Sequence, residues 1–222
     1  MTWCLSLRGV REGPHSCAAI KPTVLTPDKR RHRKLENRPR RLSGNSTNRE
    51  LTRNTESLTS IRAIVYARGM PDLEDLLIRR AAISEQKELE DLQLRASLTN
   101  AGDRDALLAH PDAIELPLMQ IAAGGVFVAE SRGTIVGFAA VEPRADGDSE
   151  LDALFVDPNM RRRGIARSLV AHCAEVARTQ ESAFLYVVGN FHAREFYDAC
   201  GFRVIGTSET RFGTGLLMRM IV

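Results

Sequence analysis

The chain lacks the apolar segments that would place it in or across a membrane. No run approaches the roughly 18 apolar residues that a membrane-spanning helix needs, although hydrophobic residues make up 43% of the 222 residues. The first residues likewise have no apolar core of the kind found in a secretory signal. We therefore expect a protein without a membrane partner, and we place it in the cytoplasm.

Common nucleotide loops and metal-binding patterns are also absent. The sequence has no G-x-x-x-x-G-K-[ST] loop, and no G-x-G-x-x-G follows a β-rich run, which argues against a nucleoside triphosphatase and a dinucleotide enzyme. No His/Cys/Asp/Glu cluster suggests a metal site, so no metal is expected. A reduced setting explains the scattered cysteines without disulfides. The four cysteines are Cys4, Cys17, Cys173 and Cys200.

The positive charge is concentrated at the start of the chain. Residues 1–60 hold 13 Lys and Arg against 5 Asp and Glu, although the net charge of the whole chain is only +3. Apolar residues there keep no steady period, so the segment cannot bury enough surface to offset its ordering entropy, and we expect a disordered extension. We interpret it as a passive extension, or as upstream sequence from a misassigned start. A nucleic-acid-binding arm or a targeting peptide is the alternative, which the absence of an aromatic platform disfavours.

Residues 61–222 are predicted to form one α/β domain. A β-rich run at 61–68 predicts the first strand, and the break at 69–72 offers Asp72 as the cap of a helix. Apolar residues then keep a helical period, which predicts a helix at this point. The residues in that period are Leu73, Leu76, Leu77 and Ala81.

Further helices and a run of strands should follow. A second helix is expected at about 85–98, and helical turns over 102–123, where Pro111 and Pro117 prevent one long helix. Turn signals then separate three predicted strands, because Ser-Arg-Gly and Asp-Gly-Asp tripeptides favour tight turns. The strands are expected at 126–130, 134–143 and 150–156, and the turns at 131–133 and 146–148.

The last part of the chain alternates between helix and strand. Gly201 is expected to end the final helix in the C′ position. The whole order, β-α-α-β-β-β-α-β-α-β-β, predicts a mixed sheet with helices on its faces. In this part we expect helices at 164–178 and 192–200, and strands at 184–188, 202–206 and 216–222.

A tight loop rich in Arg and Gly precedes the helix expected at 164–178. The unpaired N–H groups and partial positive charge of a helix N-terminus suit a diphosphate. Gly164 lets the backbone approach a ligand closely, and the arginines at 161–163 add attraction for phosphate. On these residues alone the loop indicates only a phosphate site, since three arginines are more often a solvated surface.

Two stretches of the chain form motifs with a fixed spacing. Leu-Phe-Val-Asp-Pro at 154–158 is followed by Arg-Arg-Arg-Gly-Ile-Ala at 161–166, and about thirty residues on, the stretch 190–202 has the pattern Asn…Ala…Phe-Tyr…Gly-Phe. Both resemble motifs of the GNAT superfamily of acetyl-CoA-dependent N-acetyltransferases, whose loop reads Gln or Arg, two residues, Gly, one residue, and Gly or Ala. The resemblance covers about 61–222 and implies a GNAT-like acyltransferase fold, with two parallel strands that splay apart at the cofactor site.

The resemblance implies which groups would hold acetyl-CoA. The pantetheine arm would lie between the strands at 150–156 and 184–188, against the backbone of Phe155 and Val156. Asn190 would reach the arm from the end of the second strand, although an ordinary N-cap of the next helix is an equally good interpretation. The diphosphate would lie on backbone N–H groups of Arg161, Arg162, Arg163, Gly164, Ile165 and Ala166.

The resemblance also implies catalytic residues. Tyr197 is the candidate general acid for the departing thiolate, and its alternative is a core aromatic on an apolar helix face. Glu150 and Asp152 lie two apart on one strand, so they should point to the same face, where either could be the base. Glu150 is slightly favoured, and a salt bridge or solvated strand end is the alternative for both. The Val156 N–H is the expected oxyanion donor.

The expected function is transfer of an acetyl group from acetyl-CoA to a small-molecule primary amine, within a ternary complex and without a metal. One alternative acceptor is a protein N-terminus or lysine. Another alternative is a catalytically idle acetyl-CoA-sensing module whose basic arm binds nucleic acid. The presence of Tyr197 and Glu150 favours an enzyme, so a nucleic-acid partner is not expected. A homodimer stays open, because many members of the family dimerise.

Overall fold

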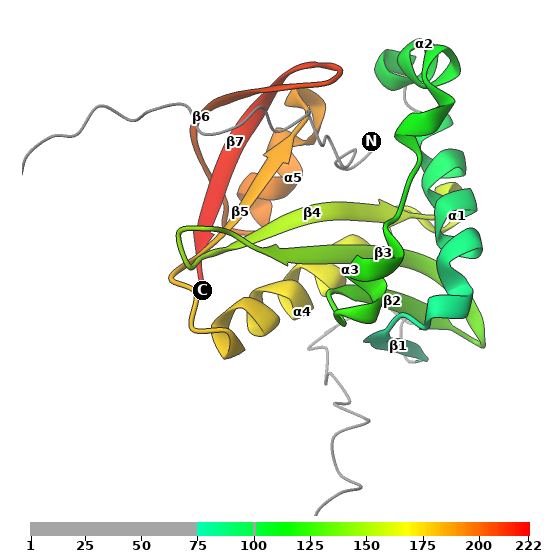
Figure 1. Ribbon diagram of the computed structural model, residues 1–222, viewed down its shortest axis with the longest axis horizontal. Helices are drawn as coiled ribbons and strands as arrows, with labels where there is room; N and C mark the ends of the chain where they lie inside the picture. Colours follow the sequence, from blue (N-terminus) through cyan, green and yellow to red (C-terminus); the bar gives the residue numbers. More distant parts are fainter. Residues whose placement is uncertain (1–74, 100) are drawn as a thin grey trace, which may run out of the picture. The chain divides into compact units, whose positions relative to one another are not determined.

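The computed structural model describes residues 75–99 and 101–222 (Figure 1). The expected extension at 1–60, the strand expected at 61–68 and the helix cap at Asp72 lie outside these residues. No helix in the described part of the chain is long and apolar enough to cross a membrane.

The described residues form a seven-stranded mixed sheet. Its strands are β1 (Leu76–Arg80), β2 (Val126–Ser131), β3 (Thr134–Pro143), β4 (Ser149–Val156), β5 (Phe184–Gly189), β6 (Arg203–Thr210) and β7 (Gly213–Ile221). Their order across the sheet is β1-β2-β3-β4-β5-β7-β6. Only the β4–β5 pair is parallel. The mixed α/β fold expected from the sequence is confirmed.

Helices pack on both faces of this sheet. They are α1 (Gln86–Leu98), α2 (Ala101–Ala109), α3 (Leu118–Ala122), α4 (Ile165–Thr179) and α5 (Arg194–Ala199), with short 3₁₀ turns η1 (Ile83–Glu85), η2 (Pro111–Ala113), η3 (Pro158–Met160) and η4 (Phe191–Ala193). Buried residues of α4 and α5 form one apolar cluster with the sheet, and buried residues of α1 form a second with Ile121 of α3. Strand β4 serves both clusters, because Leu154 belongs to the first and Phe155 to the second.

The helix predicted through Leu76, Leu77 and Ala81 is wrong. These residues lie in and just after β1, which pairs antiparallel with β2. Ile78 is buried and Leu77 is exposed, as strand alternation requires. The short apolar run fits both the helical period of 3.6 and the strand period of 2, and pairing with β2 selects the strand. The Arg79 guanidinium donates a hydrogen bond to the Glu130 carboxylate at 2.8 Å, which links β1 to β2 and reinforces their pairing.

Two chain reversals predicted from the sequence are confirmed, one between β2 and β3 and one at the end of α5. Arg132 and Gly133 have φ of 52° and 75°, as a two-residue turn between β2 and β3 requires. Gly201 has a φ of 99° at the end of α5. Its N–H binds the Asp198 carbonyl at 3.1 Å, and the next N–H binds the Tyr197 carbonyl at 3.0 Å, which is a Schellman termination.

Candidate functional site

Strands β4 and β5 run side by side for only a short distance. They pair at Ser149 with Leu185 and at Glu150 with Tyr186, and beyond these residues they diverge (Figure 1). In a parallel ladder, strands that part leave the backbone groups of both edges without each other as partners. The gap between β4 and β5 is therefore lined by polar backbone edges over most of the length of β4.

Polar side chains fix the closed end of this gap. The Oδ1 atom of Asp148 accepts hydrogen bonds from the N–H groups of Ala183 and Phe184, both at 2.9 Å. The buried Ser149 hydroxyl lies 2.8 Å from that of Ser182 and donates to Gln180 Oε1 at 3.1 Å. These bonds tie the start of β4 to the start of β5, so the strands are joined at this end and separate only further on.

The edge of β4 that faces the gap includes the backbone of Val156. The Asp157 N–H donates to the Val136 carbonyl at 2.9 Å, and Gly137 pairs with Val156. Because backbone groups alternate in an antiparallel ladder, the N–H of Val156 points away from β3 and into the gap. The backbone of Phe155 instead points to Phe138 on β3. The ladder with β3 therefore competes for the Phe155 backbone groups, and their contact with a cofactor arm stays a prediction.

The loop after β4 curls before it enters α4. Asp157 accepts a hydrogen bond from the Asn159 N–H at 2.9 Å, which orders the first turn. Arg162 and Gly164 then have positive φ angles of 62° and 82°. The first helical bond runs from the Ser168 N–H to the Gly164 carbonyl at 3.0 Å, so the preceding N–H groups have no acceptor within the helix. Such a curled loop at the start of a 15-residue helix suits an anion.

Some side chains of this loop pack against the protein, and others are exposed to solvent. Arg161 donates to the Ala96 carbonyl at 3.3 Å and to the Thr99 hydroxyl, so its guanidinium binds the end of α1 rather than an open phosphate site. Arg162 and Arg163 are exposed beside the loop. The Ile165 side chain is buried and Ala166 packs against the same core, so only their backbone could meet a ligand.

Tyr197 lies fully buried beside the end of β5. Its ring meets those of Phe196 and Phe202 edge-on, with centroids 5.2 and 5.4 Å away. A Cβ atom on Gly189 would come within 2.9 Å of the Tyr197 ring, so only glycine lets the strand approach it this closely. The core-aromatic interpretation of Tyr197 therefore describes its ring, while α5 sets it next to the gap.

Asn190 caps the turn that follows β5. Its Oδ1 atom accepts a hydrogen bond from the Ala193 N–H at 2.9 Å. This is the N-cap arrangement that the sequence offered as one of two interpretations. The residue stands where β5 ends at the gap, so a second role for the amide is compatible with this bond.

Glu150 points to the face of the sheet opposite α4 and forms an ion pair there. Arg144 donates to its carboxylate at 2.8 Å, and the same guanidinium lies 4.2 Å from the centroid of the Tyr186 ring. Burial works against the charge of Arg144, but its hydrogen bonds to Asp146 and Glu150 outweigh burial, so its pKa is raised. The ion pair is the alternative that the sequence left open for Glu150.

Asp152 lies at a bulge in β4, where sequence reasoning missed a partner. Leu151 pairs with Val141 and Ala153 with Ala140, so Asp152 is the extra residue. Its carboxylate accepts a hydrogen bond from Gln120 Nε2 at 3.1 Å. Gln120 is only 6% exposed, and its Oε1 atom is buried without a hydrogen-bond partner among the described residues. Gln120 is 32 positions from Asp152, and no local pattern signals that contact.

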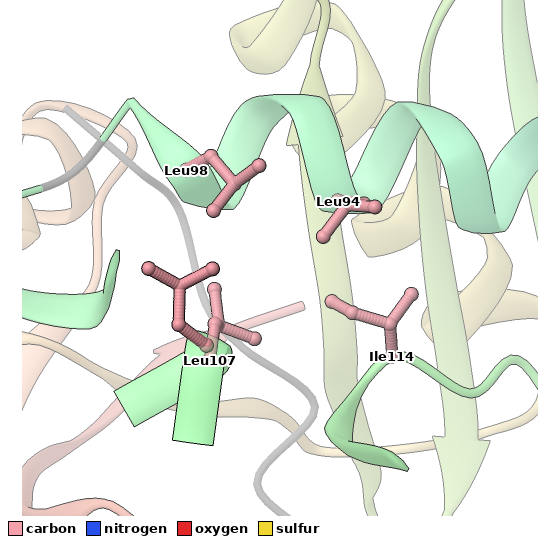
Figure 2. A pocket seen from close by; sticks show the side chains of 5 residues that line it. Leu94, Leu98, Leu107 and Ile114 are labelled. Carbon is pink, nitrogen blue, oxygen red and sulfur yellow. The ribbon is translucent and has the colours of Figure 1, made fainter. Parts of the chain in front are cut away.

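An apolar pocket of about 280 Å³ lies between α1 and α2, and Figure 2 shows leucines and an isoleucine turned towards it. The turn between β6 and β7 reaches η2, which follows α2. Arg211 binds Asp112 at 2.8 Å, and the rings of Phe212 and His110 lie 6.2 Å apart. The pocket is lined by Leu94, Leu98, Leu107, Leu108 and Ile114.

Comparisons with known proteins agree with this geometry. The family described as acetyltransferase (GNAT) matches residues 89–202, just over half of the chain. PaiA N-acetyltransferase from Thermoplasma acidophilum, in complex with coenzyme A, is similar at 15% identity and a TM-score of 0.54, over 66% of this chain and 99% of that one. Ard1 from Thermoplasma volcanium is similar at 18% identity and a TM-score of 0.52, over 67% of this chain and 98% of that one. At these identities the likeness to solved structures shows the fold. No curated protein matches the chain.

Proposed function

The chain belongs to the acetyltransferase (GNAT) family, and from this premise we propose that it transfers the acetyl group of acetyl-CoA to a primary amine of a small molecule. The single observation that carries the proposal is the parting of β4 and β5 just before a curled loop and a helix N-terminus. The gap offers backbone groups to an extended amide-containing arm, and the loop offers N–H groups to a diphosphate. The gap-facing edge of β4 and the loop belong to one continuous stretch of chain.

The residues present fit acetyl-CoA, which supplies an activated acetyl thioester when bound. Backbone N–H groups from Arg161 to Ala166 would hold the diphosphate, and the exposed Arg162 and Arg163 add positive charge beside it. Val156 and Asn190 would flank the arm from the two strands. In this assignment the Arg161 side chain holds the loop to α1 and leaves only its backbone for the cofactor.

The proposed chemistry needs a base, an oxyanion donor and an acid. An alkylammonium keeps its proton up to a pH of about 10, so a carboxylate must accept it before the nitrogen attacks. Glu150 and Asp152 are the candidates. A backbone N–H of β4 that is directed into the gap would bind the carbonyl oxygen as negative charge develops on it. Tyr197 would protonate the departing thiolate.

One feature supports a small acceptor over a polypeptide. The ion pair between Arg211 and Asp112, 2.8 Å long, joins the β6–β7 turn to η2. A polypeptide acceptor that passes between these segments would have to separate them, whereas a small amine would not.

The first test is calorimetric titration of acetyl-CoA into the full chain and two Gly164 variants. Gly164→Asn and Gly164→Asp share nearly the same shape, and both residues tolerate the left-handed backbone at this position. The aspartate alone adds negative charge against the diphosphate. We expect micromolar binding to the native chain, and binding to Gly164→Asp at least ten-fold weaker than to Gly164→Asn. Equal binding by the two variants would remove the loop as the diphosphate site, and no binding to the folded native chain would remove acetyl-CoA.

A further inference from the structure

Four side chains form a row across the sheet at the closed end of the gap. Glu150 on β4 pairs with Tyr186 on β5, Tyr186 with Arg219 on β7, and Arg219 with Arg203 on β6. Register partners point to the same face of a sheet. Residues next to the row in the sequence, such as Leu185 and Met218, belong to the apolar cluster that packs against α4 and α5. The row therefore lies on the opposite face of the sheet.

Arg219 is held rigidly in this row. Its guanidinium lies 4.0 Å from the centroid of the Phe184 ring, and it donates to the Tyr186 hydroxyl at 3.3 Å. It has no carboxylate partner among the described residues, although it is half-buried. The half-buried Arg79 and Arg144, by contrast, each bind two carboxylates. A guanidinium that is fixed in place, partly desolvated and not paired with a carboxylate can bind an anion with little loss of side-chain entropy.

Arg203 adds a second positive charge directly opposite Arg219. Side chains of register partners have Cβ atoms about 5 Å apart, and like charges placed in this way destabilise a sheet. Arg203 is exposed and, within the part of the chain that the structure describes, pairs with no acid either. An anion between the two guanidinium groups would convert this repulsion into two attractive contacts.

This position is distinct from the diphosphate loop. Val156 lies six positions after Glu150 on β4, which at about 3.3 Å per residue is roughly 20 Å, and the loop begins after Val156. An anion held by Arg219 therefore cannot be the diphosphate on that loop. Strand spacing puts the backbone of Arg219 only about 10 Å from that of Glu150, across a single intervening strand.

We propose that Arg219 and Arg203 form an anion subsite for the acceptor, so that the preferred acceptor is an amine that also carries a carboxylate or phosphate. This inference rests on the proposed function. The amine lies on the Glu150 side of the row, and the anion lies across Tyr186 on the arginine side. The distance between the two ends requires several bonds between the amine and the anionic group.

The test compares acceptors that differ in the anionic group alone. With the full chain and acetyl-CoA, KM is measured for hexylamine, 6-aminohexanoate and 5-aminopentyl phosphate. We expect KM for at least one of the two anionic amines to be ten-fold or more below that for hexylamine, and the better one identifies carboxylate or phosphate. Arg219→Met keeps the apolar stem over Phe184 and should abolish the preference, and Arg203→Met should weaken it.

Arg178→Met is the matched control, because Arg178 is an exposed arginine on α4 whose partner Glu175 lies on the same helix. This variant should keep the native preference. Arg219→Met should keep the native affinity for acetyl-CoA in calorimetric titration, which a general folding defect would not allow. A native chain without preference for anionic amines, or an Arg219→Met variant that keeps the preference, would overturn the proposal.

A direct titration separates this inference from the proposed function. Glutarate and inorganic phosphate are titrated calorimetrically into the full chain in the presence of coenzyme A, which occupies the loop. Binding by the native chain and by Arg178→Met, with loss in Arg219→Met, supports the subsite. If no amine is acetylated, the proposed function fails while this titration still decides whether the anion site exists. Titrations that Arg219→Met leaves unchanged overturn the subsite whatever the outcome for acetyl transfer.

Discussion

At the scale of single residues, one substitution can separate the packing of the Tyr197 ring from the proposed acid role of its hydroxyl. Its ring packs against Phe196 and Phe202, and its hydroxyl is the proposed acid. Tyr197→Phe keeps the ring and removes the proton donor. We expect kcat to fall by about a hundred-fold, the lower end of the usual effect of general acid catalysis, with acetyl-CoA affinity unchanged by calorimetry. Turnover equal to that of the native enzyme would leave Tyr197 as a core aromatic only.

His172 on α4 links pH to stability. Its ring meets Phe127 edge-on at 4.7 Å, and burial, helped by the charge of Arg80, lowers its pKa. The unfolded chain therefore takes up this proton more readily than the folded protein. The free energy of unfolding should be unaffected by His172 above its ordinary pKa of about 6.5 and should decrease as the pH falls through and below that value.

Denaturant unfolding between pH 7.5 and 5 measures this effect. His172→Gln cannot take up the proton, so its stability should decrease less than that of the native chain over the same range. Other acids and bases are common to both proteins and cancel in the comparison. Parallel curves for the two proteins would mean that His172 titrates alike in the folded and unfolded states.

The buried Cys173 and the partly buried Cys200 pack in the core rather than serve as reactive thiols. Burial raises the pKa of Cys173 to about 12 and that of Cys200 to about 11, although the nearby Arg167 partly opposes the shift at Cys200. The thiolate is the nucleophilic form of cysteine, so neither residue carries it near neutral pH. This agrees with direct acetyl transfer in a ternary complex, in which no cysteine needs to hold the acetyl group.

At the scale of elements, Asp148 decides where β4 and β5 begin to part. One carboxylate oxygen binds two N–H groups at the start of β5. Hydrogen bonds to a charged acceptor contribute about 1.5–3 kcal/mol, so Asp148→Ala should lower the free energy of unfolding by about that amount. Asp148→Asn keeps an acceptor oxygen and should lose less. The order of stability native, Asn, Ala in urea unfolding checks the prediction, and equal stability of the two variants would contradict it.

The sequence predicts elements well where local chemistry decides them. The turn at Arg132 and Gly133 and the helix end at Gly201 follow from residues that accept positive φ. The sequence-based prediction fails at β1, because its five residues fit both the helical period and the strand period. Pairing with β2, which is distant in the sequence, selects the strand. Likewise Gln120 meets Asp152 only because α3 packs over a bulge in β4, and neither motif nor spacing encodes that contact.

At the scale of the whole molecule, the family resemblance predicts the placement of the site but not all of its side chains. Strands β4 and β5 part, a loop precedes α4 and Tyr197 lies on a short helix, as the motifs predict, while the use of these features by a cofactor stays a prediction. The roles of Phe155 and Arg161 do not follow from the motifs, because they depend on the β3 ladder and on the end of α1. Those partners come from parts of the chain that the motifs do not describe.

Helix α1 contacts both the loop after β4 and the apolar pocket. Its last turns are held to that loop by Arg161, which binds Ala96, and by Arg95, which binds Asp157 at 3.4 Å. The same turns supply Leu94 and Leu98 to the apolar pocket. The last turns of α1 therefore join the loop to the wall of the pocket, so we expect a shift of the loop to move that wall as well.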